Sequence, residues 1–228
     1  ELNDHTQSVS TPDKYQKFIS AQQTEITFMD HIRRYISFAP HFAEAAWMTL
    51  KLTVVSMILA VILGLLIALM RIYAPEPFSS FAAAFIEIIR GTPLLIQLLF
   101  IFYALPALGI NFPRFIAAVI ALGLNYSAYE AENYRAGLYA ISKGQMEAAL
   151  SLGMNRKMAL RSVIIPQAVR IVIPPITNDF ISLLKDSSLV SLITIVELTK
   201  TYYQISSMYF DFIIPGIIIA VMYLLLGI

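Results

Sequence analysis

Two carboxylates stand in a strongly apolar stretch of this sequence, where few ionisable groups are expected. Asp179 and Asp186 are seven residues apart, with Ser182 between them and Asn178 directly before the first. Positions i, i+3 and i+7 share one face of a helix, so Asp179, Ser182 and Asp186 should line one side. Because a carboxylate exposed to lipid is costly, this side must meet protein, water or a bound molecule.

Two interpretations of these carboxylates are open. In the first, Lys185, and with it Arg135 or Arg170, neutralises them in a fixed network. In the second, one or both carboxylates line a transport pathway and bind a cationic group of the molecule that passes. The residue types fit either interpretation.

A second polar face occurs earlier in the chain. Asn125, Tyr129 and Glu132 follow the spacing i, i+4, i+7 and should also share one side of a helix. This side should face protein or a cavity, because lipid offers it no partners. It suits a transport pathway and hydrogen bonding between helices equally well.

The remaining candidates for chemistry are weak. The turn from Arg90 to Pro93 resembles a phosphate-binding turn only superficially and is better explained as a break at a helix start. His5, His31 and His41 lack the spacing of metal ligands, and the sequence contains no cysteine. No Gly-rich ATP-binding loop and no nucleophile with its base can be recognised, so we expect no metal site and no enzyme.

The composition is that of a membrane protein. Of the 228 residues, 58% are hydrophobic and only 14% are charged, and the mean hydropathy is +0.70. These values exceed what a soluble globular domain normally carries. The net charge of +1 indicates no nucleic-acid partner.

The apolar runs predict an all-α bundle of about five membrane-spanning helices. The expected spans cover residues 52–70, 80–108, 115–138, 163–195 and 212–228. The second should break near Pro93, and Pro166, Pro174 and Pro175 should bend or unwind the fourth. A polar helix over 196–208 should connect the last two spans.

The chain divides into two regions at this level. Residues 1–44 should form an extracytoplasmic tail with an amphipathic helix at the membrane interface, over residues 31–42. Residues 45–228 should form the membrane domain. Because the chain starts at Glu1 and ends within an apolar run at Ile228, we expect it to be part of something longer.

The segment 144–166 interrupts the apolar pattern and reads as a short exposed helix. Its first half has high helix propensity, and Gly153 can end the helix in a left-handed conformation. Small side chains would let a partner approach closely. Arg156, Lys157 and Arg161 follow, and basic residues next to membrane helices favour the cytoplasmic side. An odd number of spans then leaves the amino terminus outside.

The same segment resembles the EAA signature of bacterial ABC-importer permeases. Glu147, Ala148 and Ala149 are followed by Gly153, and the sequence VIIP at 163–166 takes the place of the usual I-x-L-P. Further likenesses are RGTPLL at 90–95, AYEAE at 128–132, GQ at 144–145 and LKDSSL at 184–189. Together they resemble the polar amino acid permease family of type I importers over most of the chain.

This resemblance implies a function and a set of partners. The chain would be the permease subunit of an importer for polar amino acids, and an acid at Asp179 suits substrates with a cationic group. Partners would be two ABC ATPase subunits, a second permease copy or paralogue, and an extracytoplasmic binding protein. ATP and Mg²⁺ would be bound by the ATPase subunits, with no cofactor in this chain. The coupling contact would use Glu147, Ala148, Ala149, Gly153 and Arg156.

Two other function classes fit the sequence less well. A secondary transporter would use the buried carboxylates for ion coupling, but the small number of spans and the missing internal repeat argue against it. An intramembrane enzyme or signalling subunit is disfavoured by the lack of a catalytic set.

Overall fold

The computed structural model describes residues 34–228, so the expectations for residues 1–33 lie outside the described part. The chain separates into two compact units, residues 1–41 and 42–228. Of the first unit, residues 34–41 are described, and they are helical apart from a turn at Phe38. The second unit holds every feature discussed below.

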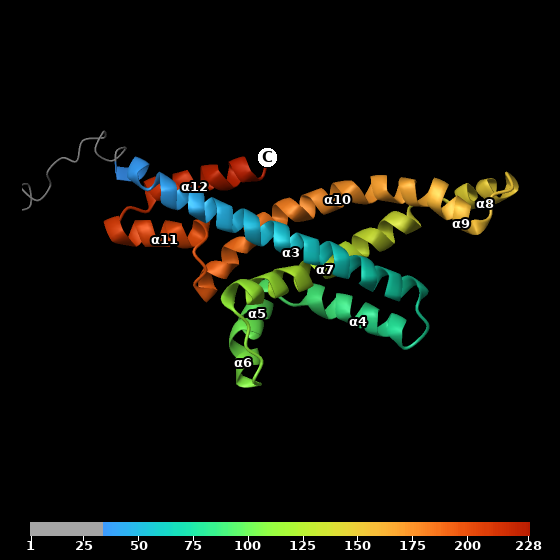
Figure 1. The fold of residues 1–228 in the computed structure, drawn as a ribbon, viewed down its shortest axis with the longest axis horizontal. Helices are drawn as coiled ribbons and strands as arrows, with labels where there is room; N and C mark the ends of the chain where they lie inside the picture. Colours follow the sequence, from blue (N-terminus) through green and yellow to red (C-terminus); the bar gives the residue numbers. More distant parts are fainter. Residues whose placement is uncertain (1–33) are drawn as a thin grey trace, which may run out of the picture. The chain divides into compact units, whose positions relative to one another are not determined.

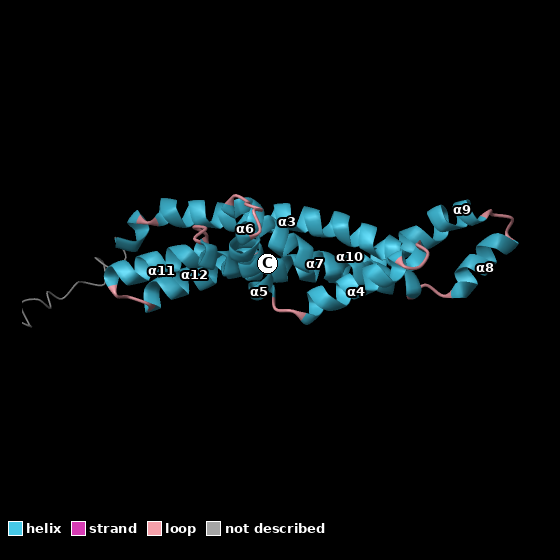
Figure 2. Cartoon of the chain, turned by 90° about the horizontal axis from the view of Figure 1, so that it is seen from below, coloured by secondary structure: helices cyan, strands magenta, loops and turns pink. Residues whose placement is uncertain are grey.

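The described residues form helices joined by short loops, with no strand among them, which confirms the all-α prediction (Figure 1 and Figure 2). The α-helices are α3 (Ala39–Tyr73), α4 (Phe78–Gly91), α5 (Leu94–Leu99), α6 (Leu105–Ala107), α7 (Arg114–Tyr139), α8 (Lys143–Ser151), α9 (Arg156–Ala159), α10 (Ile165–Asp186), α11 (Leu198–Tyr209) and α12 (Ile213–Leu226). Two π-helical segments, η1 (Phe100–Ala104) and η2 (Leu160–Ile164), and one 3₁₀ segment, η3 (Ser187–Ile193), join them.

Each of the five predicted spans corresponds to helical structure. Among the described residues, α3 and the continuous helical run 156–193 are long and apolar enough to cross a membrane. The helices over 78–91 and 94–107 pass the same test as one bent pair, with an angle of 103° between them. The 26-residue α7 is long enough but polar in its second half, and α12 is apolar but only 14 residues long.

The bend between α4 and α5 comes from local sequence. Thr92 is extended, as expected of a residue before proline, so α4 cannot continue past Gly91. The amide of Gln97 donates to the carbonyl of Ile89 at 2.8 Å and to the hydroxyl of Thr92 at 2.8 Å. The turn at Pro93 is therefore the structural break that the sequence indicates.

The prolines of the fourth span do not unwind it at α10. Pro174 and Pro175 lie inside α10, which remains helical from Ile165 to Asp186, so of the two predicted effects, bending or unwinding, unwinding is absent there. Their missing N–H groups remove only two bonds of a long ladder, and the remaining bonds hold the helix. Pro166 falls in the first turn of α10, where its N–H is not needed.

Helix α7 is the centre of the bundle. It packs against α4, α5, α10 and η3, and its small residues allow close approach. The main apolar core includes Leu52 of α3, Leu98 of α5, Leu122 of α7 and Ile193 of η3, all buried. This packing fixes the faces of α7 and α10 that carry the polar side chains.

Candidate functional site

Asp179 of α10 faces α7 and is half-buried. Its carboxylate accepts a hydrogen bond of 2.8 Å from the side-chain amide of Asn133. Within the described residues, no lysine or arginine comes within ion-pair distance of Asp179. The carboxylate is therefore oriented by a neutral partner and keeps unused acceptor positions.

Asp186 lies two turns further along α10 and has a different partner. The hydroxyl of Tyr126, whose side chain is 5% exposed, donates to the Asp186 carboxylate at 2.7 Å. The described part of the chain contains no ion pair of Asp186 with a cation. The interpretation in which Lys185, Arg135 or Arg170 neutralises the two carboxylates is therefore wrong for this structure.

The other two candidate residues of α10, Ser182 and Asn178, are exposed. Ser182 donates its hydroxyl proton to the backbone carbonyl of Asn178 at 3.0 Å, an ordinary bond within the helix. Both side chains are open to the surface beside Asp179. The face expected from the spacing of Asp179, Ser182 and Asp186 is thus partly accessible.

The three residues of the earlier polar face have separate partners. Asn125 is 5% exposed and donates to the side-chain oxygen of Gln97 at 3.2 Å, which is hydrogen bonding between helices. Glu132 forms ion pairs with Arg71 of α3 and with Arg135, the latter at 2.7 Å. Tyr129 is 36% exposed.

Tyr129 and Glu132 line a polar cavity between α3, α4 and α7. Its volume is about 470 Å³, and its lining is Arg71, Ile86, Glu87, Arg90, Gly91, Tyr129, Glu132 and Arg135. The guanidinium of Arg90 stacks over the Tyr129 ring, 5.2 Å from the centroid. Since three arginines face two glutamates, the cavity has an excess of positive charge.

Sequence reasoning did not select several residues that matter here. Tyr126 and Asn133 are seven residues apart on α7, as are Asn125 and Glu132. This spacing indicates that Tyr126 and Asn133 share one side of the helix, and it could have identified them as candidates. Glu130 is fully buried, and neither carboxylate oxygen has a hydrogen-bond partner. Its Cβ lies against Gly64 of α3. No pattern in the local sequence predicts this close approach of the two helices.

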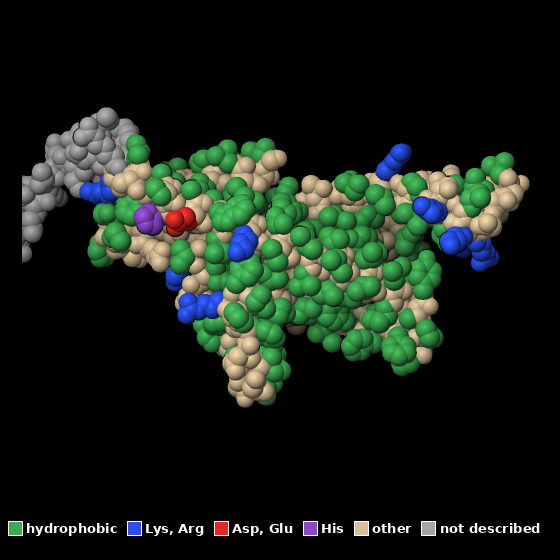
Figure 3. Space-filling model, viewed as in Figure 1, with side chains coloured by type: hydrophobic (Ala, Val, Ile, Leu, Met, Phe, Trp, Pro, Cys, Tyr) green, Lys and Arg blue, Asp and Glu red, His purple; other side chains and the backbone are tan. Residues whose placement is uncertain are grey.

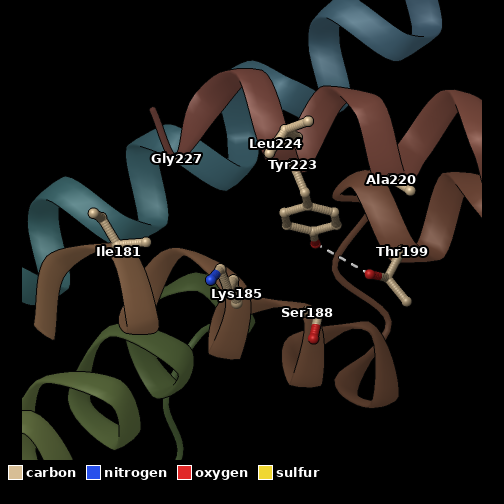
Figure 4. Close-up of a pocket in the computed structure, with 8 residues that line it drawn as sticks. All are labelled: Ile181, Lys185, Ser188, Thr199, Ala220, Tyr223, Leu224 and Gly227. Carbon is tan, nitrogen blue, oxygen red and sulfur yellow. Dashed lines mark hydrogen bonds between the residues drawn. The ribbon is translucent and has the colours of Figure 1, made fainter. Parts of the chain in front are cut away.

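A second cavity, of about 520 Å³, lies where α10 and η3 meet α11 and α12 (Figure 4). Lys185 is its single charged lining residue. The hydroxyls of Thr199 and Tyr223 are 3.1 Å apart, and Tyr223 also donates to Glu197 at 2.8 Å. These two hydroxyls are thus already engaged, and Lys185 supplies the one charge of the lining.

Helix α8 forms a hairpin with α9 at the end of α10 remote from α11 and α12 (Figure 1). It ends as the sequence indicates: Gly153 has φ +83°, and the N–H groups of Gly153 and Met154 bond to the carbonyls of Leu150 (3.0 Å) and Ala149 (3.2 Å). This pair of hydrogen bonds is a Schellman cap. The predicted short helix with a glycine cap is confirmed.

The surface of this hairpin is only partly as expected. Glu147, Ala148 and Arg156 are exposed, and Figure 3 shows Lys and Arg side chains gathered at this end. Ala149, however, is 4% exposed and packs inside the hairpin. The expectation that Ala149 itself offers a docking surface is wrong, because α8 uses that position to pack against its own chain.

No group of three or more His, Cys, Asp or Glu that could hold a metal occurs among residues 34–228. Nor do the polar contacts above join a nucleophile to a base. Within the described part, the site offers carboxylates, amides and guanidinium groups for non-covalent binding.

Residues 60–228 match a family model described as "Binding-protein-dependent transport system inner membrane component". The L-cystine transport system permease protein TcyB of Bacillus subtilis (strain 168) is 42% identical over 175 residues, covering 77% of this chain and 75% of that protein. The arginine transport system permease protein ArtQ of the same organism is 38% identical over 188 residues, covering 82% and 86%.

Solved structures are also similar. The crystal structure of an amino acid ABC transporter with histidines has a TM-score of 0.80 and 45% identity, covering 85% of this chain and 91% of that one. An inward-facing structure of the MetNI methionine ABC transporter has a TM-score of 0.66 and 22% identity, covering 82% and 89%. The second likeness concerns the fold alone.

Proposed function

Since this chain belongs to the binding-protein-dependent transport system inner membrane component family, we propose that it is the subunit through which an ATP-driven importer passes polar amino acids. Relatives named for L-cystine, arginine and glutamine transport support the substrate class. The observation that carries the proposal is Asp179, a half-buried carboxylate that no cation of the described chain neutralises.

The proposed pathway runs along the exposed polar face of α10. Asp179 binds the cationic group of the substrate, and Asp186, Ser182 and Asn178 extend the polar surface along the helix. An ammonium or guanidinium group adds hydrogen bonds to an ionised carboxylate, which makes the contact stronger than one between neutral groups. A substrate with a positive side chain or α-ammonium group therefore fits best.

The proposed coupling contact is the α8–α9 hairpin. Glu147, Ala148, Gly153 and Arg156 meet an ATPase subunit on the cytoplasmic side, and Ala149 holds the hairpin in shape. When ATP and Mg²⁺ close the ATPase dimer, the hairpin moves with it and the permease changes between inward- and outward-open states. The chain itself performs no chemistry.

The remaining partners follow from this arrangement. A second permease copy or paralogue completes the pathway, a binding protein delivers substrate from outside, and the amino terminus lies outside. The chain resides in the bacterial inner membrane, where the described apolar helices have their lipid surface.

Co-purification and reconstitution test this proposal. The chain is expressed with its partner ATPase and binding protein and reconstituted in proteoliposomes. ATP hydrolysis is then measured with the binding protein loaded with L-arginine, L-glutamine or L-cystine. Stimulation by at least one amino acid is expected. Uptake without ATPase subunits, driven by an ion gradient, would instead identify a secondary transporter and refute the proposal.

A further inference from the structure

The polar cavity of about 470 Å³ between α3, α4 and α7 contains a cation without an ion-pair partner. Arg71 and Arg135 are both engaged by Glu132. Arg90, the third arginine, forms no ion pair within the described residues and is exposed. The cavity therefore presents one available guanidinium group, and its volume is within the ~300–1,000 Å³ range of small-molecule sites.

Arg90 is held in place by its surroundings. Its guanidinium stacks on the ring of Tyr129, and its position at the end of α4 is set by the turn at Pro93. Arg90 is nevertheless exposed, and a guanidinium group carries paired N–H donors that match a carboxylate. A carboxylate is thus the ligand that an oriented, unpaired arginine binds best.

Arg90 of α4 and Asp179 of α10 lie on different helices, but both contact α7, and the two groups are not within ion-pair distance. Asp179 is oriented by Asn133, and Arg90 is oriented by Tyr129, a residue four positions earlier on α7. One cation and one anion, each oriented by α7 and kept apart, are complementary to a molecule that carries both charges.

We propose that Arg90, stacked on Tyr129, binds the α-carboxylate of the transported amino acid while Asp179 binds its positive end. This inference rests on the proposed function and adds a residue to its pathway. Arg90 selects amino acids over amines of the same side chain, because an amine has no carboxylate with which the guanidinium can form a charge-assisted contact.

Lys185 is the obvious rival, since it too is a cation without an ion pair in the described chain. It lines the separate cavity against α11 and α12, where the hydroxyls of Thr199 and Tyr223 are joined to one another (Figure 4). Lys185 therefore serves as a matched control: the same charge on an accessible residue, in another cavity.

The test compares each amino acid with its α-amide, which keeps the ammonium group and side chain but lacks the carboxylate. Binding of L-arginine and L-argininamide, and of L-glutamine and its α-amide, is measured on the complex with its ATPase subunits in nanodiscs. We expect the wild type to prefer the acid. Arg90→Gln should lower affinity for the acid roughly tenfold to a hundredfold and change affinity for the amide by less than about twofold.

Two further variants keep the test decisive. Arg90→Lys retains charge but not the planar fork, so its preference for the acid should lie between those of the wild type and Arg90→Gln. Lys185→Gln should retain the wild-type preference. Thermal unfolding of each complex is measured alongside, so that a loss of binding through misfolding is recognised.

The possible failures are distinguishable. An unchanged preference in Arg90→Gln and Arg90→Lys, or its loss in Lys185→Gln alone, would overturn the role of Arg90 and leave the proposed function intact. If the wild-type complex responds to none of L-arginine, L-glutamine and L-cystine, the proposed function fails, and the role of Arg90 fails with it.

Discussion

Asn133 and Asp179, 46 residues apart in sequence, are joined by a hydrogen bond of 2.8 Å between α7 and α10. The bond orients the carboxylate without neutralising it, because an amide carries no charge. This relationship distinguishes Asp179 from Glu132, whose carboxylate is occupied by two arginines. It makes Asp179 the better candidate for binding a substrate and determines what its replacement should do.

Asp179→Asn should weaken substrate binding while leaving the fold stable. The change removes a charge-assisted contact worth about 1.5–3 kcal/mol, so apparent affinity should fall roughly tenfold to a hundredfold. Because no cation of the described chain is ion-paired to Asp179, the change leaves no cation without its partner. Substrate binding, basal ATPase activity and thermal stability are measured in one preparation. Full transport by Asp179→Asn and by Asp186→Asn would remove both carboxylates from the mechanism.

Ala148→Trp should uncouple ATP hydrolysis from transport. Ala148 is exposed on α8, so the indole does not disturb the packing of this chain but separates α8 from an ATPase surface. Membrane insertion should be normal, and substrate-stimulated hydrolysis should be lost. Gly153→Trp should also abolish transport, but it additionally strains the cap, since Gly153 has φ +83°. Stimulated hydrolysis at the wild-type rate in Ala148→Trp would mean that α8 is only a linker.

The topology can be read by labelling, because the sequence contains no cysteine. Asn155 precedes the basic residues of α9 and η2, and Asn111 lies in the turn before α7; both are exposed. Basic residues favour the cytoplasmic side, so Asn155→Cys should be protected in intact cells and Asn111→Cys should react with an impermeant maleimide. Reaction of Asn155→Cys from outside would contradict the proposed orientation.

Gly64→Ala should destabilise the bundle. A Cβ at Gly64 would lie 2.6 Å from the Cβ of Glu130 and 2.9 Å from the carbonyl oxygen of Ser127, so α3 and α7 would have to separate. Such overpacking costs about 1–3 kcal/mol. Gly91→Ala is the matched control, since a Cβ there meets nothing within 4 Å. Thermal unfolding in detergent should show a lower midpoint for Gly64→Ala alone; equal midpoints would contradict the close approach of the helices.

Glu197 should make stability depend on pH. Its carboxylate caps α11 through the N–H groups of Thr199 (2.8 Å) and Lys200 (2.7 Å), and burial raises its pKa. A raised pKa in the folded state means that stability is greatest below the unfolded pKa of about 4.3 and declines as pH rises through the folded value. Unfolding of the wild type should show this decline, and Glu197→Gln should not. If the wild type and Glu197→Gln had the same pH profile of stability, the pH dependence would come from a group other than Glu197.

The sequence by itself determined the features that depend on neighbours along the chain. Apolar runs specified the helices, the pair Thr92-Pro93 specified the break between α4 and α5, and Gly153 specified the end of α8. The shared face of Asp179 and Asp186 was equally predictable, because helical periodicity fixes which residues of one helix lie together. The motif around Glu147 indicated the family in the same way.

Only the tertiary structure decided which faces meet. Tyr126 reaches Asp186 across 60 residues of sequence, and Arg71 reaches Glu132 across 61, so neither pairing is encoded in a local spacing. The same holds for Ala149, whose small side chain suited either a partner's surface or the inside of its own hairpin. Periodicity tells which residues share a side of a helix, whereas the partner of that side depends on how several helices pack at once, and that packing assigned Asn133 to Asp179 and left Arg90 without a carboxylate.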